Sequence, residues 1–328
     1  MSRPAPGEVL AWVVRGQMVE SVHTGHLVAL DASGRDVLRL GEPEQQIYPR
    51  SCLKPLQAVG MLRAGVSLTT DQLALACASH NGEERHREVT LGILESVGLD
   101  ATALANTPDL PLEPAAALAW QRGGRGPEPI AQNCSGKHAA MVATCVAAGW
   151  PVAGYLDAEH PLQRHLLAVI AELTQVAPAH VAVDGCGAPQ PATTVRGLAG
   201  AFARIAAAEE GTVEHRVAEA MRAHPFLVAG TGREDTEAMR AVPGLILKGG
   251  ADGVHAGALP DGRALAFKVS DGAARPRPVV LRAVLRELGV EPAEDWAWER
   301  VPVLGHGEPV GAVYPAFGAD ALAFGGAA

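Results

Sequence analysis

Near both ends of the chain, apolar residues form short runs or alternate with polar ones, and this pattern predicts β-strands. In the first forty residues the predicted strands are 9–14, 18–23, 26–30 and 36–40. After residue 243 strands are predicted at 244–248, 254–259, 264–269, 301–304 and 309–313, with a helix at 278–288. Both chain ends are therefore expected to contribute strands.

Between these regions, apolar positions recur every three or four residues, which is typical of amphipathic helices. One helix is expected to begin at Ser51 or Cys52, because Pro55 fits only a first helical turn. Further helices are predicted at 72–78, 82–97, 135–148, 161–176, 193–208, 212–223 and 234–241, with a long loop around a short helix at 105–130.

This order predicts an α/β protein of the α+β kind. One antiparallel sheet would be built from both chain ends, with a helical lobe inserted between its strands. We expect a single domain, residues 1–328, with a sheet lobe of 1–50 plus 243–328 and a helical lobe of 51–242.

Composition narrows the range of functions. The formal charge is −9, from 27 Lys+Arg against 36 Asp+Glu, and there is no basic run, which argues against nucleic acid as a partner. No apolar stretch is long enough to cross a membrane, and the first residues lack a signal-peptide pattern. We expect a soluble, cytoplasmic protein whose five cysteines are thiols or metal ligands.

Three stretches carry residue types used in acyl transfer. Ser51 and Lys54 are one helical turn apart, so a neutral amine could take the proton of a serine placed at a helix N-terminus. The plain structural alternative is a helix-capping serine and a solvated lysine. This spacing is common, and the rest of the chain must decide between the two.

The second stretch is Ser79-His80-Asn81, in a predicted loop between two helices, where side chains can project into a cleft. A helix-capping role for Ser79 is the alternative. The third is Lys248-Gly249-Gly250, where a lysine ends an apolar strand and glycines allow close approach. A simple turn or bulge is the alternative there.

Taken in order, S-x-x-K, S-x-N and K-G-G form the motif set of penicillin-recognising serine enzymes. Two further stretches each place a cysteine, Cys134 or Cys186, in a glycine-containing turn. Paired thiolates with one or two nitrogen or oxygen ligands suit Zn²⁺, with His138 or Asp184 as chemical partners. Two ordinary buried cysteines are the alternative.

Together these stretches resemble the asparaginase II family, the third class of L-asparaginases, over nearly the whole chain. The resemblance rests on Pro49-Arg-Ser-Cys-Leu-Lys-Pro-Leu-Gln57, Ala78-Ser-His-Asn-Gly-Glu83, Asn133-Cys-Ser-Gly-Lys-His-Ala-Ala-Met141, Asp184-Gly-Cys-Gly-Ala-Pro189 and Lys248-Gly-Gly-Ala-Asp-Gly-Val254. It implies a single catalytic domain with a fold similar to serine β-lactamases and glutaminases, and hydrolysis of L-asparagine to L-aspartate and ammonia.

Carried over by position, the resemblance implies catalytic roles for Ser51, Lys54, Ser79 and Lys248, with Lys268 competing for the last place. It implies Zn²⁺ ligands at Cys134, Lys137 and Cys186, which replaces the chemical guess of His138 or Asp184. The residues expected to contact substrate or surround the zinc are Arg50, His80, Asn81, Asn133, His138 and Asp184.

In the expected mechanism, Ser51 attacks the side-chain amide of asparagine with Lys54 as base, while Ser79 and Lys248 relay a proton. Arg50 is the candidate for the substrate α-carboxylate and Asp184 for its α-amino group. One alternative is a glutaminase, or another serine-dependent amide or β-lactam hydrolase. Another is a zinc-dependent binding protein without catalysis. A homodimer is expected.

Overall fold

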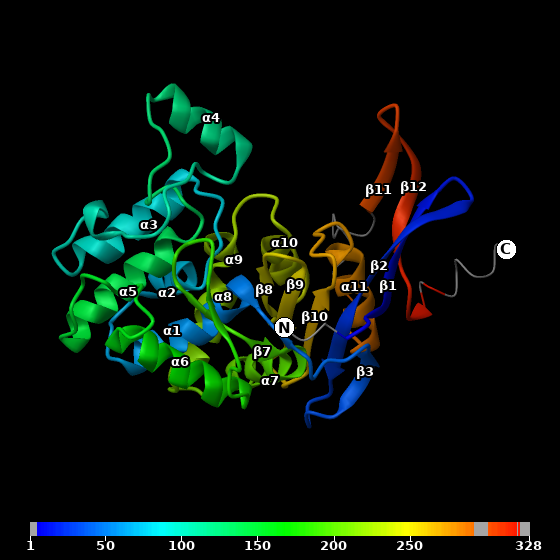
Figure 1. Ribbon diagram of the computed structural model, residues 1–328, viewed down its shortest axis with the longest axis horizontal. Coiled ribbons are helices and arrows are strands. Elements are labelled where there is room, and N and C mark those ends of the chain that lie inside the picture. Colours follow the sequence, from blue (N-terminus) through cyan, green and yellow to red (C-terminus); the bar gives the residue numbers. More distant parts are fainter. Residues whose placement is uncertain (1–4, 292–300, 320, 322–328) are drawn as a thin grey trace. The chain divides into compact units, whose positions relative to one another are not determined.

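The computed structural model describes residues 5–291, 301–319 and 321 (Figure 1). The chain divides into two compact units. The sheet unit comprises Met1–Cys52, Thr193–Ala207 and Glu237–Ala328, and the helical unit comprises Leu53–Ala192 and Ala208–Thr236. Residues 193–207, which the sequence analysis assigned to the helical lobe, thus belong to the sheet unit.

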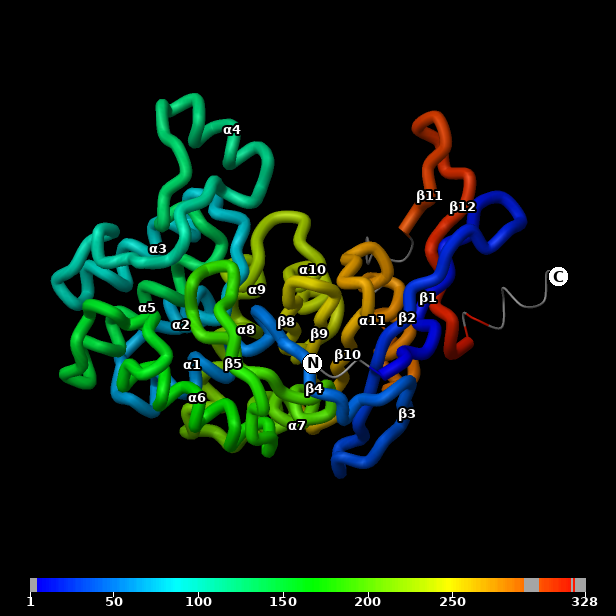
Figure 2. The backbone as a smooth tube through the Cα atoms, viewed as in Figure 1, coloured from blue at the N-terminus to red at the C-terminus, as the bar shows by residue number. Residues whose placement is uncertain are grey.

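An antiparallel sheet with the order β11-β12-β1-β2-β10-β9-β8 forms the sheet unit, and β3 pairs with β2 off this path. Its strands are β1 (Glu8–Arg15), β2 (Met18–Leu30), β3 (Asp36–Leu40), β8 (Ile246–Gly250), β9 (Val254–Ala258), β10 (Ala264–Val269), β11 (Val301–Gly305) and β12 (Glu308–Pro315). In Figure 2 the blue trace of β1 runs beside the red trace of β12, and Trp12 pairs with Tyr314. The prediction of one antiparallel sheet built from both chain ends is confirmed.

The long strand β2 differs from the prediction of two short strands. It continues through Gly25, pairing with β1 over 18–25 and with β10 over 25–30. A Cβ at Gly25 would lie 2.2 Å from the Lys268 carbonyl oxygen, so glycine permits the close strand pairing there. Glycine at position 25 therefore lets one continuous strand pair on both sides.

Two helices pack on the strands of the sheet unit. Helix α7 (Val195–Ala206) contacts β2, β9 and β10, which explains why its residues belong to this unit. Helix α11 (Arg277–Glu287) contacts β1, β3 and β12. A small ladder of β4 (Gln46–Ile47) and β7 (Thr193–Thr194) precedes α7, and the sequence pattern did not predict it.

Helices dominate the helical unit. They are α1 (Lys54–Arg63), α2 (Thr70–Ala76), α3 (Glu84–Glu95), α4 (Pro114–Arg122), α5 (Ser135–Ala148), α6 (Pro161–Thr174), α8 (Val213–Ala223) and α9 (Pro225–Val228), with a 3-10 turn η2 at Ala101–Ala103. Helix α5 is buried from Ser135 to Cys145 and contacts α1, α2, α3 and α6. Helix α10 (Glu234–Ala241) runs from the end of this unit into the sheet unit.

A short hairpin in the helical unit is the main element that the sequence pattern missed. Strands β5 (Val181–Val183) and β6 (Pro189–Pro191) pair, and the tight turn between them carries Cys186. Three-residue strands that contain proline give no alternating pattern to detect. Among the described residues, no helix is long and apolar enough to span a membrane.

Candidate active site

Lys54 is the first residue of α1, and only 2% of its surface is exposed. Its Nζ lies 2.9 Å from Ser79 Oγ and 3.0 Å from Cys134 Sγ, and it also donates a hydrogen bond to the Ala78 carbonyl. The alternative of a solvated lysine is therefore wrong. An amine in hydrogen-bond contact with a serine hydroxyl has the geometry needed to exchange a proton with it.

Ser79 lies in the loop after α2 and is 9% exposed. Its backbone N–H donates to the Val228 carbonyl at 3.0 Å, and the N–H of Asn81 donates to the Ala229 carbonyl at 2.8 Å. These backbone bonds hold the loop against the segment after α9. The Ser79 hydroxyl is thus presented to Lys54 by a loop that is fixed at two points.

The side-chain amide of Asn81 forms hydrogen bonds with other residues of the protein. Its Oδ1 accepts from Arg233 at 3.1 Å, and its Nδ2 donates to Glu83 at 2.9 Å and to the Thr231 carbonyl at 3.0 Å. Gly230 has φ +123°, and a Cβ there would lie 2.5 Å from Asn81 Nδ2, so only glycine fits beside the amide. Asn81 therefore holds the Ser79 loop in place, which differs from the substrate contact expected for it.

His80 is fully buried and both of its ring nitrogens are engaged. Nδ1 accepts from Gly82 N at 3.0 Å, and Nε2 lies 3.0 Å from Ser135 Oγ. Burial, together with His86 and the charge of Lys54, holds the pKa of His80 well below its usual value. The neutral ring links the Ser79 loop to the first turn of α5, so no ring nitrogen is left for the expected substrate contact.

Two thiols and a lysine lie next to this serine–lysine pair. Cys134 and Cys186 are hydrogen-bonded to each other, and Lys137 Nζ lies 3.2 Å from Cys186 Sγ. The bond from Cys186 and the charges of Lys54 and Lys137 hold the pKa of Cys134 well below its usual value. Burial acts to lower the pKa of Lys137, but the charges of Cys186 and Cys134 outweigh it and raise that pKa.

Residues flanking the thiols complete the cluster. Asn133 Oδ1 lies 2.9 Å from Cys134 Sγ, and Asp184 Oδ2 lies 3.8 Å from Cys186 Sγ. His138 Nδ1 is 2.8 Å from the Tyr155 hydroxyl, and burial lowers the pKa of His138 to about 4. The fold therefore brings the stretch around Cys134 together with the stretch around Cys186. They meet where the N-terminal end of α5 approaches the β5–β6 turn.

In the sheet unit, the residues around Ser51 lie next to the Lys248-Gly249-Gly250 stretch. Residues Arg50–Leu53 form a 3-10 turn, so α1 begins slightly later than predicted. Cys52 Sγ donates to the Lys248 carbonyl at 3.0 Å. A Cβ at Gly250 would lie 2.6 Å from the Pro49 carbonyl oxygen, which shows why position 250 is a glycine. The half-exposed Ser51 thus lies on a segment packed against the end of β8.

The charged residues of this region already have protein partners. Arg50 has a left-handed backbone with φ 53°, which residues with a Cβ rarely adopt and which often marks functional sites. Its guanidinium pairs with Asp252. Lys248 is fully buried and its Nζ donates to the Gly249 carbonyl at 2.6 Å. Lys268, the competing candidate, donates to the Asp252 and Val269 carbonyls, and burial lowers its pKa.

Comparison with known proteins identifies the family to which this chain belongs. A sequence model of the family described as L-asparaginase II matches residues 11–315. The chain belongs to the L-asparaginase II family. No curated protein sequence matched it. One solved structure, described as "EstCE1, a hydrolase with promiscuous acyltransferase activity", aligns with 80% of this chain and 93% of its own at 12% identity and a TM-score of 0.44. This structural similarity is too low to support a conclusion about function.

The family match covers the five stretches quoted above and supports an amidohydrolase of the asparaginase type. The residue that the sequence analysis missed is Arg233, which donates to Asn81 and, at 3.4 Å, to the Ser79 carbonyl. It lies in a Gly-Thr-Gly-Arg turn far from Ser79 in sequence, and only its glycines could have drawn attention to it.

The zinc ligands implied by the family resemblance can be compared with the donor atoms present. Two sulfurs and the Lys137 amine converge, and the buried His138 also interacts with Cys186. Within the described part of the chain, no group of three or more His, Cys, Asp and Glu side chains is arranged to hold a metal ion. The donor atoms therefore fit zinc only if Lys137 serves as the third ligand after losing its proton.

Proposed function

We propose that this protein hydrolyses L-asparagine to L-aspartate and ammonia through a serine acyl-enzyme. Membership of the L-asparaginase II family supports an amidohydrolase, and one contact supports the serine–lysine chemistry. That contact is the 2.9 Å hydrogen bond between Lys54 Nζ and Ser79 Oγ, inside a single compact unit.

In the proposed first step, the Oγ of Ser51 bonds to the side-chain amide carbon of asparagine and its proton passes to Lys54. Chain continuity supports this pairing, because Ser51 precedes Lys54 by three residues, close to one helical turn. The tetrahedral intermediate then loses its C–N bond. Ser79 receives a proton from Lys54 and passes it to the leaving nitrogen, which departs as ammonia.

In the second step, water attacks the aspartyl ester, releases aspartate and restores the serine hydroxyl. Backbone N–H groups near Ser51 would stabilise the negative oxygen of both tetrahedral intermediates. Lys248 is proposed as a further member of the proton relay. Arg50 would bind the substrate α-carboxylate and Asp184 its α-amino group, on grounds of charge.

Zinc is part of the proposal as an accessory ion. Cys134, Cys186 and Lys137 would hold it, since paired thiolates suit this metal and the three side chains already converge. When bound, zinc would neutralise the thiolates and tie the first turn of α5 to the β5–β6 turn. The acyl-transfer steps above need only the serines and lysines.

Steady-state kinetics with three substrates test the function. Purified protein should release ammonia from L-asparagine with a higher kcat/KM than from L-glutamine, and should turn over a chromogenic β-lactam far more slowly. A preference for glutamine or for the β-lactam would keep the serine–lysine chemistry and replace the substrate. Saturable ligand binding without hydrolysis of any of the three would contradict the proposal.

A further inference from the structure

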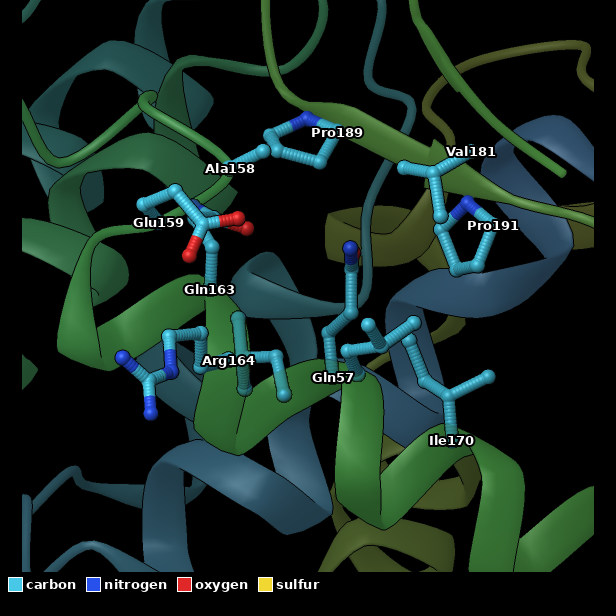
Figure 3. A pocket seen from close by; sticks show the side chains of 11 residues that line it. Gln57, Ala158, Glu159, Gln163, Arg164, Ile170, Val181, Pro189 and Pro191 are labelled. Carbon is cyan, nitrogen blue, oxygen red and sulfur yellow. The ribbon is translucent and has the colours of Figure 1, made fainter. Parts of the chain in front are cut away.

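A pocket separate from the Lys54–Ser79 pair lies within the helical unit, between α1, α6 and the β5–β6 hairpin (Figure 3). It holds about 610 Å³ of empty space, counting its open mouth. Its lining residues are Gln57, Ala158, Glu159, Gln163, Arg164, Leu166, Leu167, Ile170, Val181, Pro189 and Pro191.

Gln57 points into this pocket from α1 (Figure 3). The residue is only 4% exposed, and in the described part of the chain its side-chain amide makes no hydrogen bond. The amide faces the open pocket, so it is available to a bound ligand. A ligand that filled the pocket would have to bond to this amide, because covering it without a partner would cost free energy.

The other polar groups of the pocket define the opposite end of such a ligand. Gln163 is already used, because its Nε2 donates to the Tyr155 carbonyl at 2.7 Å. Glu159 is exposed at the mouth, its carboxylate has no ion-pair partner among the described residues, and it is turned toward the pocket (Figure 3). The Arg164 guanidinium is turned away from Gln57 in the same view. The Glu159 carboxylate is therefore the charged group turned toward the pocket.

The walls between these two ends are apolar. Leu166 and Ile170 of α6 form one side, and Pro191 of β6 lies on the other. Such walls fit a short methylene chain and offer no partner to a polar middle section.

We propose that this pocket binds a short aliphatic compound with an ammonium group at one end and a carboxylate or carboxamide at the other. The carboxylate or carboxamide would bond to the Gln57 amide, which can both donate and accept. The methylene chain would lie against Leu166 and Ile170, and the ammonium group would lie near Glu159.

Isothermal titration calorimetry with 4-aminobutanoate and 4-aminobutanamide tests the binding. Butylamine and butanoate, which each lack one end group, are the matched ligands. The two-ended compounds should bind one per chain, and each one-ended compound should bind about tenfold more weakly or worse. Absence of saturable binding by both two-ended compounds would overturn the proposal, as would butylamine or butanoate binding as tightly as the two-ended compounds.

Three variants locate the bound compound. Gln57→Leu should weaken binding about tenfold and Glu159→Gln a few-fold, since the first loses a buried hydrogen bond and the second an exposed charge. Glu95→Gln is the control, because it removes the same charge from an exposed residue outside the pocket, and it should keep the native affinity. Glu159 and Glu95 are both exposed, so their variants should fold even if Gln57→Leu does not. Unchanged affinity in folded Gln57→Leu and in Glu159→Gln would place the ligand elsewhere and contradict the proposal.

Discussion

The side chains of Lys54 and Ser79 meet at 2.9 Å although 25 residues separate them in sequence. Both belong to the helical unit, and the loop that carries Ser79 is held by backbone bonds to Val228 and Ala229. The same amine lies 3.0 Å from Cys134, so the serine–lysine chemistry and the thiol cluster share one group. Changes at either part are therefore expected to affect the other.

Replacing each serine separately should distinguish their roles. Ser51→Ala is expected to lower kcat by about 10⁴-fold or more, because it removes the proposed nucleophile. Ser79→Ala should lower it by about 10²–10³-fold, since only a proton relay is lost. Ammonia release under saturating asparagine measures both. Peptide mapping after rapid quenching would identify the acylated serine, and the reverse order of effects would make Ser79 the nucleophile.

The two candidate lysines of the sheet unit can be separated by matched substitutions. Lys248→Met is expected to lower kcat by at least about 10²-fold, as for loss of a proton-transfer group. Lys268→Met should have a much smaller effect, because the Lys-Gly-Gly stretch places the relay at the fully buried Lys248, whereas Lys268 is partly exposed. Thermal denaturation checks that both variants fold. A large effect for Lys268→Met with none for Lys248→Met would exchange their assignments.

Stability should fall as the solution is acidified below about pH 6.5. The pKa values of His80 and His86 are lowered by burial, so the unfolded chain binds protons at these rings before the folded chain does. Each ring therefore stabilises the fold above its unfolded pKa, and this stability is lost as the pH decreases, by up to about 1.4 kcal/mol per pH unit per ring.

Urea denaturation at about pH 7.5, about pH 6 and about pH 5 measures this dependence, above the range where most carboxylates titrate. His86→Leu should reduce the slope. A free energy of unfolding that is constant or rises toward pH 5 would contradict the burial of neutral histidines.

The thiol cluster is tested by metal content. Protein reconstituted with zinc and then desalted should retain about one ion per chain, and Cys186→Ala should retain far less. Cys145→Ala is the control, because Cys145 is also buried, with its pKa raised to about 11 by burial, but lies outside the cluster. Equal zinc content in all three proteins would reject the proposed ligands.

Local spacing and strand patterns predicted much of the fold. The Ser-x-x-K spacing singled out Lys54, which the structure buries against a second serine. Predicted helix 135–148 and strand 264–269 agree with α5 and β10 residue for residue. These elements have strong periodicity and clear ends, so short-range information was sufficient.

What the sequence could not provide depends on packing between distant segments. The contact of Lys54 with Cys134 and the bonds of Arg233 to the Ser79 loop join segments separated by 80 and 154 residues. The engagement of His80 and Asn81 inside the protein also follows from such packing. Residue types alone suggested substrate contacts for these two residues. A polar residue in a loop looks the same in the sequence whether its side chain is free to bind a substrate or is hydrogen-bonded to other parts of the protein.

Ammonia release from L-asparagine by the native protein and by Lys54→Met tests the central proposal most directly. Methionine fills a similar volume without an amine, so the variant should remain folded. We predict activity in the native protein, and a kcat at least about 10³-fold lower in the variant, since Lys54 serves both the nucleophile and the relay. Native protein that releases no ammonia, or a folded variant that keeps most of its activity, would contradict the proposed mechanism.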